Sequence, residues 1–332
     1  MAFTSIVVPA FNAEKTLVDT LLSLQRQTCT EFEVIVVNDG STDTTAAIAA
    51  GFCSDPRFRV IHQKNRGLAG ARNSGIAGAQ GDVVAFCDAD DMWEPGKLAR
   101  HISHLEAKPH VGISYAGSAF ISEDGALTGQ SQRPRLQNID AKHIFKRNPV
   151  GNGSAAVIRR AVFDEIAFRP RSETERDWYF DETFRQSEDI ECWLRIALTT
   201  NWAFEGIPGL LTRYRINSGG LSAATDRQLA AWERMVRKLS KFNSGFFAEE
   251  TEVARAYQIR YLNRRAISDL DSSRAVHLAR VWLACSLRPL WEEPLKSVAT
   301  LAATALLAVT GPKALRKTMD LAARAHRTEA LT

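Results

Sequence analysis

Up to about residue 110, the chain alternates between short apolar runs and longer segments with helical periodicity. The apolar runs are continuous and rich in β-branched residues, which is typical of strands buried on both faces of a sheet. A regular alternation of strand and helix predicts a parallel sheet with right-handed crossover connections. The strands are expected at residues 5–8, 33–37, 59–61 and 83–86, and the helices near residues 14–25, 42–51, 68–79 and 97–107.

Beyond that point the pattern becomes mixed and then helical. Three more strands and one helix are expected before residue 222, and helical periodicity dominates from about residue 225, with prolines as breaks. We therefore expect an α/β domain over residues 1–222 and a helical C-terminal region over residues 223–332. The later strands are expected at residues 111–120, 153–158 and 201–214, and the later helices near 188–198, 226–242, 248–270, 273–287 and 313–326.

Composition and charge narrow the class of protein. The 332 residues are 45% hydrophobic and 24% charged, which is ordinary for a globular protein. A net charge of +4 is too small to indicate nucleic acid as a partner. The five scattered cysteines include no CxxC pair, which disfavours a disulfide framework and favours a reducing cytoplasm.

The ends of the chain show no sign of export or membrane insertion. No basic region or cleavage site precedes the first predicted strand. The longest apolar run, residues 298–309, is shorter than the roughly 18–20 residues of a spanning helix. We therefore expect a cytoplasmic protein without a transmembrane helix.

Three acidic residues follow the fourth predicted strand. Asp88, Asp90 and Asp91 lie at its carboxyl end, where open parallel sheets bind ligands. Alternate residues of an extended segment point to the same side, so Asp88 and Asp90 can converge. Mg²⁺ or Mn²⁺ prefers carboxylate and phosphate oxygens, and such a cation stabilises a departing diphosphate. The alternative is a solvated acidic loop that caps the next helix.

The second predicted strand ends in the sequence Asn-Asp-Gly-Ser-Thr-Asp, residues 38–43. Gly40 permits a tight turn, and Ser41 or Thr42 can cap the following helix. A plain strand–turn–helix connection explains these three residues but not Asp39. Its carboxylate can accept a hydrogen bond from a nucleobase or a ribose, so Asp39 is a candidate binding residue.

Two other segments allow two interpretations each. Arg72 can meet a diphosphate or a base, but the spacing of its segment favours a helix with a basic outer face. Glu188 and Asp189 begin a predicted helix, where the backbone dipole favours acids. The functional alternative is that one of them is a general base that deprotonates a hydroxyl.

Two other patterns are interpreted as structural. Residues 151–156 match the G-x-G-x-x-A dinucleotide pattern, but no strand precedes them and no clear helix follows, so the match is attributed to chance. His101 and His104 share a helical face without a third ligand, which favours a solvated helix surface over a metal site.

Taken in order, the motifs resemble those of family 2 glycosyltransferases. The resemblance covers about residues 3–222 and depends on six segments together. It implies an α/β fold of the GT-A type, a Rossmann-like, mostly parallel sheet flanked by helices, with a helical C-terminal extension outside the match. The segments are residues 7–12, 36–43, 65–73, 88–91, 187–195 and 214–222.

The resemblance implies which residues bind the donor, a nucleotide-diphosphate sugar that is usually a UDP-sugar. Pro9, Phe11 and Asn12 would belong to the opening strand and donor-binding turn. Asp39 would bind the base, and Arg72 would help to hold the nucleotide. Residues 214–222 would form the loop that closes the donor site.

The resemblance also implies the catalytic machinery. Asp88 would contact the ribose or diphosphate, and Asp90 would ligate Mn²⁺ or Mg²⁺, with Asp88 as a second candidate ligand. Asp189, with Glu188 beside it, would be the catalytic base, six residues before Arg195 as in the family. The expected reaction inverts the anomeric centre in a single displacement.

Two departures from the family pattern refine this expectation. Asn38 stands where the family often has an acid, so that contact is lost or altered. The QxxRW signature of processive synthases is absent. We therefore expect one sugar to be added to each acceptor, a saccharide or lipid-linked saccharide, in bacterial exopolysaccharide, O-antigen or glycolipid assembly.

The C-terminal region suggests a membrane surface. Residues 311–327 contain five cations and one acid, with apolar residues at helical spacing. A basic amphipathic helix can lie on an anionic membrane, so we consider peripheral association with the inner face of the cell membrane. The alternative is a packed helix with a solvated basic face.

Two other functions remain as alternatives to a glycosyltransferase. A sugar-nucleotide nucleotidyltransferase would need a Gly-rich loop with Arg and Lys after the first strand, where Pro9-Ala10-Phe11-Asn12 stands. A non-catalytic nucleotide-sugar-binding scaffold is disfavoured by the intact Asp90 and Asp189.

Overall fold

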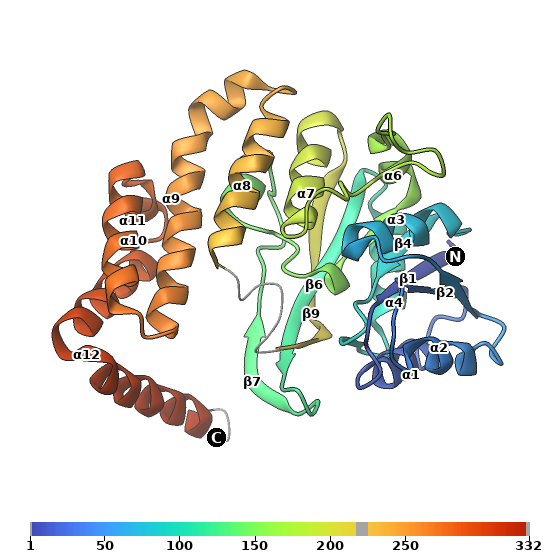
Figure 1. Cartoon of the computed structure of the whole chain (residues 1–332), viewed down its shortest axis with the longest axis horizontal. Coiled ribbons are helices and arrows are strands. Elements are labelled where there is room, and N and C mark those ends of the chain that lie inside the picture. The colour runs from blue at the N-terminus through green and yellow to red at the C-terminus, as the bar shows by residue number, and fades with distance from the viewer. Residues whose placement is uncertain (1, 217–224, 330–332) are drawn as a thin grey trace. The chain divides into compact units, whose positions relative to one another are not determined.

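The computed structural model describes residues 2–216 and 225–329, and the chain divides into two units. The first unit comprises Met1–Ile144 and Asn148–Ala223, and the second comprises Phe145–Arg147 and Ala224–Thr332. Residues 145–147 therefore belong to the second unit, although the chain on both sides of them belongs to the first. Figure 1 shows the sheet of the first unit in blue to yellow and the helices of the second in gold to red.

The N-terminal strands are parallel and buried. β1 (Thr4–Ala10) lies between β2 (Phe32–Asn38) and β4 (Val83–Phe86), and β3 (Phe58–His62) lies beyond β2. Every residue of β1, β2 and β4 is buried, as expected of continuous apolar runs. The carboxyl ends of these strands share one edge of the sheet, so the motifs that follow them are neighbours.

The other half of the sheet is mixed. β8 (Val157–Arg159) pairs antiparallel with both β4 and β6 (Val111–Ile121), and β6 pairs parallel with β9 (Ala203–Arg215). β5 (Met92–Trp93) pairs antiparallel with β9, and β7 (Leu127–Gln132) pairs antiparallel with β6. The strand order is β3-β2-β1-β4-β8-β6-β9-β5, with β7 beside β6. The predicted α/β sheet flanked by helices is confirmed.

Helices cover both faces of the parallel strands. Successive side chains of a strand point to opposite faces, so Ile6 and Val8 pack in one core layer while Val7 meets the opposite one. The helix α3 (Gly67–Gly78) packs closely against β1. At its Gly75 a Cβ would overlap with Cγ1 of Val7, so only glycine allows this separation. The first layer contains α1 (Leu17–Gln25), α2 (Thr45–Phe52) and α4 (Lys97–Ala107), and the second contains α3 (Gly67–Gly78).

Two predictions in the first unit are wrong. Residues 153–158 were expected as a strand, but Gly153–Ala155 forms the 3₁₀ turn η1 and only Val157–Arg159 is extended. His101 and His104 do not lie on a solvated surface, because both rings contact the Ser114 hydroxyl and His101 is fully buried. The remaining helices of this part of the chain are α5 (Ala141–Lys146), α6 (Arg160–Ile166) and α7 (Glu188–Thr199).

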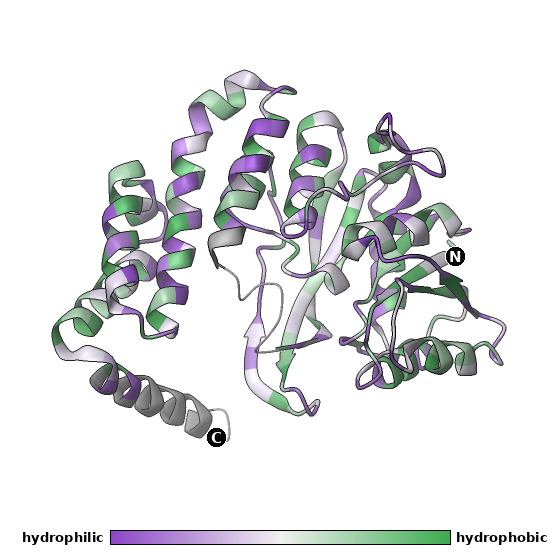
Figure 2. Ribbon diagram, in the orientation of Figure 1, coloured by the Kyte–Doolittle hydropathy of each residue, from purple (hydrophilic) through white to green (hydrophobic). Residues whose placement is uncertain are grey.

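The second unit is helical and has its own core. Its helices mix hydrophobic and hydrophilic residues along their length (Figure 2), as expected of amphipathic helices that pack against one another. Trp282 and Leu307 are fully buried in its core. The helices are α8 (Thr225–Leu239), α9 (Ser244–Ser268), α10 (Ser272–Cys285), α11 (Arg288–Glu292) and α12 (Pro294–Glu329).

Residues 145–147 are held firmly within this unit. The ring of Phe145 stacks on Trp232, with 5.4 Å between centroids, and meets Phe247 edge-on at 5.1 Å. Lys146 forms an ion pair with Glu292 at 2.7 Å, and Arg147 pairs with Glu293. A short sequence that lies far from the C-terminus therefore contributes to the helical core.

The helix α12 is longer than the sequence indicated. It begins at Pro294 and is kinked at Gly311, whose φ of 77° precedes Pro312. Residues Pro294–Lys313 are long and apolar enough to cross a membrane by length and composition, with a mean hydropathy of 1.3 and 22% of the segment buried. The expectation of no such helix considered only the uninterrupted run at 298–309. Length and composition permit a span but do not require one.

Candidate active site

The turns after β1 and β2 are joined to each other. Asn12 adopts the left-handed conformation, with a φ of 49°, and its side-chain oxygen accepts the backbone N–H of Thr42 at 2.9 Å. Its own N–H donates to the Ser41 hydroxyl at 3.0 Å. Asn12 thus fixes the two turns, whereas Phe11 is 53% exposed beside them and Pro9 is buried within β1. Of these three predicted donor-binding residues, Phe11 and Asn12 are exposed and Pro9 is not.

Asp39 has a structural role that the sequence did not reveal. Its carboxylate accepts the side-chain N–H of Gln63 at 2.6 Å and the backbone N–H groups of Arg66 and Gly67 at 2.8 Å each. These backbone groups open α3, where N–H groups lack helical partners. A carboxylate offers about four acceptor positions, so one position on Oδ2 is not used by these three donors.

The buried guanidinium of Arg72 brings two predicted motifs together. It donates to Oε1 of Glu188 at 2.8 Å and to Oδ1 of Asp88 at 3.0 Å. The guanidinium lies over the rings of Phe86 and Phe180, and Arg72 is only 2% exposed. The basic outer face favoured by spacing is therefore wrong for this residue. Residues that are far apart in sequence meet here at the carboxyl end of β4.

Arg72 stays charged in this buried environment. Burial opposes the charged form, but the carboxylates of Asp88 and Glu188 outweigh it and raise the pKa of Arg72. Two hydrogen-bonded carboxylates around one guanidinium satisfy the requirement that a buried charge be paired. The guanidinium is therefore a permanent cation between the two acidic motifs.

The three acids after β4 have different surroundings. Asp91 is fully buried, and its carboxylate accepts the Ser154 hydroxyl at 2.5 Å and the backbone N–H of Arg215 at 2.9 Å. Burial raises the pKa of Asp91 well above its ordinary value. Asp88 and Asp90 remain partly exposed at the edge of the sheet. These two, and not Asp91, are therefore the acids available to a ligand.

The donor set fits a divalent cation shared with a substrate. The described residues contain no group of three or more His, Cys, Asp or Glu side chains that could hold a metal ion. Mg²⁺ and related ions are often held by one or two carboxylates together with substrate phosphates and waters. Asp88 and Asp90 are two partly exposed carboxylates that would fit such a partial site if a substrate diphosphate completed it.

The predicted base lies at the start of α7. The residue before the helix, Ser187, has a φ of 60°. Oδ2 of Asp189 accepts the side-chain N–H of Asn148 at 2.7 Å, and Oδ1 accepts the N–H of Ile190 at 2.8 Å. Burial raises the pKa of Asp189, and Arg72 opposes that rise. Glu188 accepts a hydrogen bond from the Arg72 cation, whereas the donors to Asp189 from Asn148 and Ile190 are neutral.

The sequence did not predict the contacts of Arg215, which lies in the predicted closing loop 214–222, or of Lys97. Arg215 donates from Nε to the carbonyl of Asp90 at 2.8 Å, which fixes the acidic turn from β9. Lys97 is fully buried, where its ammonium donates to the Ser154 carbonyl at 2.6 Å and the Thr212 hydroxyl at 2.8 Å. Burial lowers the pKa of Lys97 to about 7. No periodicity or motif marks such contacts, because they form between distant elements.

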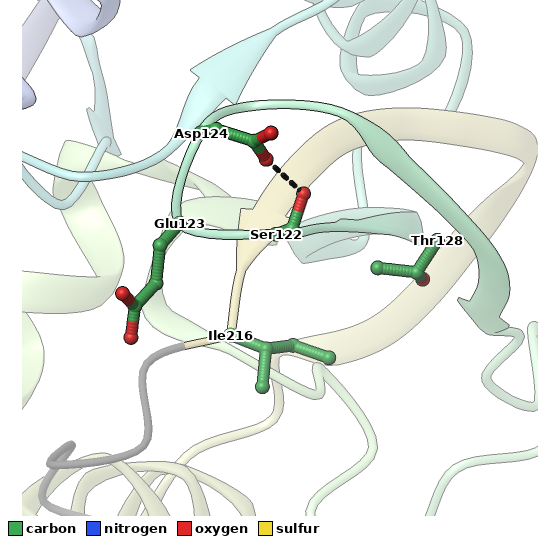
Figure 3. Close-up of a pocket in the computed structure, with 5 residues that line it drawn as sticks. All are labelled: Ser122, Glu123, Asp124, Thr128 and Ile216. Atoms are coloured by element: carbon green, nitrogen blue, oxygen red, sulfur yellow. Dashed lines mark hydrogen bonds between the residues drawn. The ribbon is translucent and has the colours of Figure 1, made fainter.

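A separate hollow of about 520 Å³ opens at the turn between β6 and β7. It is lined by Ser122, Glu123, Asp124, Thr128 and Ile216, and the Ser122 hydroxyl donates to the Asp124 carboxylate (Figure 3). Arg215, which also binds the carbonyl of Asp90 in the acidic turn, donates hydrogen bonds to the carbonyls of Ser122 and Glu123. The predicted closing loop, residues 214–222, starts beside this hollow, but residues 217–222 lie outside the described part of the chain.

Comparison with known proteins gives consistent results. The family model for glycosyl transferase family 2 matches residues 5–167. The chain is 28% identical over 226 residues to UDP-Glc:alpha-D-GlcNAc-diphosphoundecaprenol beta-1,3-glucosyltransferase WfgD of Escherichia coli, covering 68% of this chain and 81% of that protein.

Two solved structures share the fold. One is residues 1–349 of S. aureus TarS in complex with UDP-GlcNAc, with a TM-score of 0.54, 18% identity and coverage of 93% of this chain and 92% of that one. The other is the mannosyltransferase PcManGT of Pyrobaculum calidifontis with GDP-Man and Mn²⁺, with a TM-score of 0.57, 19% identity and coverage of 99% and 87%. By the family match and the named relative, this chain is a glycosyltransferase of glycosyl transferase family 2, and the solved structures show that its fold is of the GT-A type.

Proposed function

We propose that the protein is an inverting, metal-dependent glycosyltransferase that adds one sugar from a UDP-sugar to a hydroxyl of a lipid-linked saccharide. The observation that carries this proposal is the buried Arg72, which contacts Asp88 of the acidic turn and Glu188 beside the candidate base. Because Arg72 holds the two motifs next to each other, both can act on the same substrate.

The donor would lie along the carboxyl ends of β1, β2 and β4. Phe11 offers an exposed ring for stacking on a base, and Asp39 offers its remaining acceptor position to a base N–H. The E. coli relative is named for UDP-Glc, and the TarS structure contains UDP-GlcNAc. These names favour a UDP-sugar.

Asp88 and Asp90 would hold Mn²⁺ or Mg²⁺ together with the donor diphosphate. Such a cation neutralises the negative charge that develops as the diphosphate departs. PcManGT was solved with Mn²⁺, which supports the same class of cofactor here. Arg215 would keep Asp90 in place through the backbone carbonyl that it binds.

Asp189 would be the base that takes the proton of the acceptor hydroxyl as that oxygen attacks the anomeric carbon. The attack and the departure of UDP on the opposite face occur in one displacement, which inverts the anomeric configuration. Glu188 is less suited to this role because its carboxylate is paired with Arg72. We therefore assign Asp189 as the base and Glu188 as a positioning residue.

A lipid-linked acceptor would place the protein at the inner face of the membrane. The E. coli relative is named for a diphosphoundecaprenol acceptor. In this chain Trp291 is 81% exposed and Leu295 is 86% exposed, and Leu287, Val298 and Val309 are also exposed. Residues 287–316 contain four cations and two acids, and both acids, Glu292 and Glu293, form ion pairs. An apolar helical stripe with flanking cations fits an anionic membrane surface.

The membrane hypothesis thus shifts toward the N-terminal half of α12. The sequence had placed it at residues 311–327, but the side chains of Lys317, Arg324 and Arg327 lie outside the described part of the structure. The exposed apolar residues of α11 and α12 provide the structural support.

A direct test follows UDP release from UDP-glucose and UDP-N-acetylglucosamine with Mn²⁺ and a GlcNAc-diphospholipid acceptor. We expect release that EDTA, Asp90→Ala and Asp189→Asn each abolish, and an inverted anomeric configuration in the product by NMR. Retention of configuration, or full activity in EDTA, would contradict the proposed mechanism. Absence of UDP release from both UDP-sugars would contradict the choice of donor, and absence of turnover with any nucleotide sugar would favour a non-catalytic scaffold.

A further inference from the structure

The segment 148–154 contacts the site at both of its ends. It overlaps residues 151–156, whose match to the G-x-G-x-x-A pattern was attributed to chance. At its first residue, Asn148 donates its side-chain N–H to Oδ2 of Asp189 at 2.7 Å. The side-chain oxygen of Asn148 accepts the N–H groups of Val150 and Gly151 at 3.0 and 3.1 Å. Because the oxygen is held by the turn, the amide N–H can point only toward the base.

At the other end, Ser154 holds the acidic turn. Its hydroxyl accepts the backbone N–H of Asp88 at 2.8 Å and donates to the Asp91 carboxylate at 2.5 Å. Its carbonyl accepts the side chains of Lys97 and Trp93. Ser154 is fully buried, so these groups have no water to replace a lost partner.

Between these ends the segment runs against the central guanidinium. A Cβ at Gly153 would overlap with Nη2 of Arg72, so no side chain is tolerated there while Arg72 keeps its position. The neighbouring Asn152 donates to the Ser118 hydroxyl of β6 at 2.8 Å, which anchors the segment to the sheet.

We propose that residues 148–154 form a positioning element with two separable tasks: Asn148 orients Asp189, and Ser154 fixes the turn that carries Asp88 and Asp90. This inference rests on the proposed function, because it assigns Asp189 as base and the two acids as metal ligands. It predicts that the two ends control different kinetic quantities.

Asn148 acts on Asp189 through the hydrogen bond that it donates to Oδ2. One protein donor holds each oxygen, so each keeps an acceptor position for an incoming hydroxyl. The charged and titratable groups near Asp189 are Arg72, Glu188 and Tyr214. Among these influences, the Asn148 hydrogen bond lowers the pKa of Asp189. Its removal should raise that pKa and move the acidic limb of the kcat profile to higher pH.

A pair of substitutions separates this task from a mere turn-holding role. Asn148→Asp retains the oxygen that binds Val150 and Gly151 but replaces the donor by a second carboxylate. Asn148→Ala removes both. We expect the acidic limb of kcat to move up by about one pH unit in Asn148→Ala and further in Asn148→Asp, with donor KM within about twofold. Asn201→Ala, an exposed asparagine in the same unit, is the matched control.

The Ser154 task is measured by metal-assisted nucleotide binding. In Ser154→Ala we expect the Kd for UDP with Mn²⁺, by isothermal titration, to rise about tenfold, which is the loss of about 1.4 kcal/mol. We expect UDP binding without Mn²⁺ and the acidic limb of kcat to stay unchanged. Ser103→Ala on the exposed face of α4 is the control. Circular dichroism and thermal melting of each variant report whether it folds.

The outcomes distinguish this inference from the proposed function. If Asn148→Asp keeps the wild-type profile while Asn148→Ala is impaired, Asn148 only holds the turn and the inference fails at that end. An unchanged UDP affinity with Mn²⁺ in a folded Ser154→Ala overturns the other end. By contrast, an active Asp189→Asn or Asp90→Ala enzyme would overturn the proposed function itself.

Discussion

Arg72 is the residue on which the geometry of the site depends most. It comes from α3, yet it fixes the distance between a carboxylate after β4 and another at the start of α7. Both partners would be left as like charges in a largely buried environment without it. A lysine in its place offers one ammonium instead of a planar fork, so it cannot satisfy both partners with the same geometry.

The first prediction concerns this residue. Arg72→Ala should lower the free energy of unfolding by about 3–5 kcal/mol, because it leaves the buried Glu188 carboxylate without its cation. Urea unfolding at pH 7 measures the loss. Combining Arg72→Ala with Glu188→Gln should recover part of it, and strictly additive losses in that double variant would contradict the assigned ion pair.

A second prediction uses the buried Lys97. Its pKa of about 7 in the folded protein lies below the ordinary 10.5, so between these values the unfolded chain binds more protons. The contribution of this group to stability therefore rises with pH from about 7 to 10.5. Lys97→Met removes the titration. Urea unfolding at pH 7 and pH 9 should show the wild type gaining stability relative to Lys97→Met, and a constant difference would argue against the assignment.

At this scale the sequence identifies some site residues and misses others. Asp39, Asp88, Asp90 and Asp189 were selected because they fall, in order, in motifs that resemble those of one family, since acids at strand and helix ends are common by themselves. Asp39 nevertheless proved to hold α3 as well. Asn148 and Lys97 were not singled out, Ser154 lay in a pattern attributed to chance, and Arg215 lay in the predicted closing loop without a role of its own. Each acts through contacts that form only in the folded protein.

Among the elements, α3 connects the most parts of the site. Its first N–H groups bind Asp39, its middle carries Arg72, and Gly75 rests on Val7 of β1. The position of the guanidinium is therefore set by how closely this helix approaches the sheet.

The third prediction tests this close approach. Gly75→Ala would place a methyl group into Val7, and we expect a loss of about 1–3 kcal/mol of stability from overpacking, with reduced activity. Gly51→Ala in α2 is the matched control, because nothing lies within 4 Å of the added methyl. That substitution should gain about 0.5–1 kcal/mol from helix propensity. Equal effects of both substitutions on thermal melting would refute the packing argument.

Strands could be predicted where every residue of the segment lies in the same buried environment. β1, β2 and β4 are buried throughout, so their continuous apolar runs were sufficient. Residues 153–155 form the turn η1 instead, and Gly153 lies so close to the Arg72 guanidinium that a Cβ there would overlap with Nη2. That constraint comes from another element and leaves no mark in the local pattern.

For the whole molecule, the exposed stripe on α11 and α12 leads to the fourth prediction. Replacing Trp291 and Leu295 together by alanine should reduce flotation with vesicles of anionic phospholipid by about tenfold, since most of the apolar area offered to the bilayer is lost. Tyr261→Ala, an exposed aromatic residue on α9, should float like the wild type.

The same experiment, with two additions, distinguishes a membrane surface from a second copy of the chain and from insertion across the bilayer as what covers these exposed residues. Unchanged flotation of the double variant would exclude the stripe as the membrane contact. Light scattering of the wild type without lipid reports whether a second copy covers it instead. Resistance of the bound protein to alkaline carbonate extraction would indicate insertion across the bilayer rather than association with its surface.

The assignment of Phe145–Arg147 to the helical unit limits how the enzyme can be shortened. A chain that stops near residue 222 loses Trp232 and Phe247, the rings that cover Phe145, and the acids that neutralise Lys146 and Arg147. The remainder would expose an aromatic side chain and two unpaired cations immediately before Asn148. Such a truncated protein should aggregate during purification, and Phe145→Ser would be a sensible first repair.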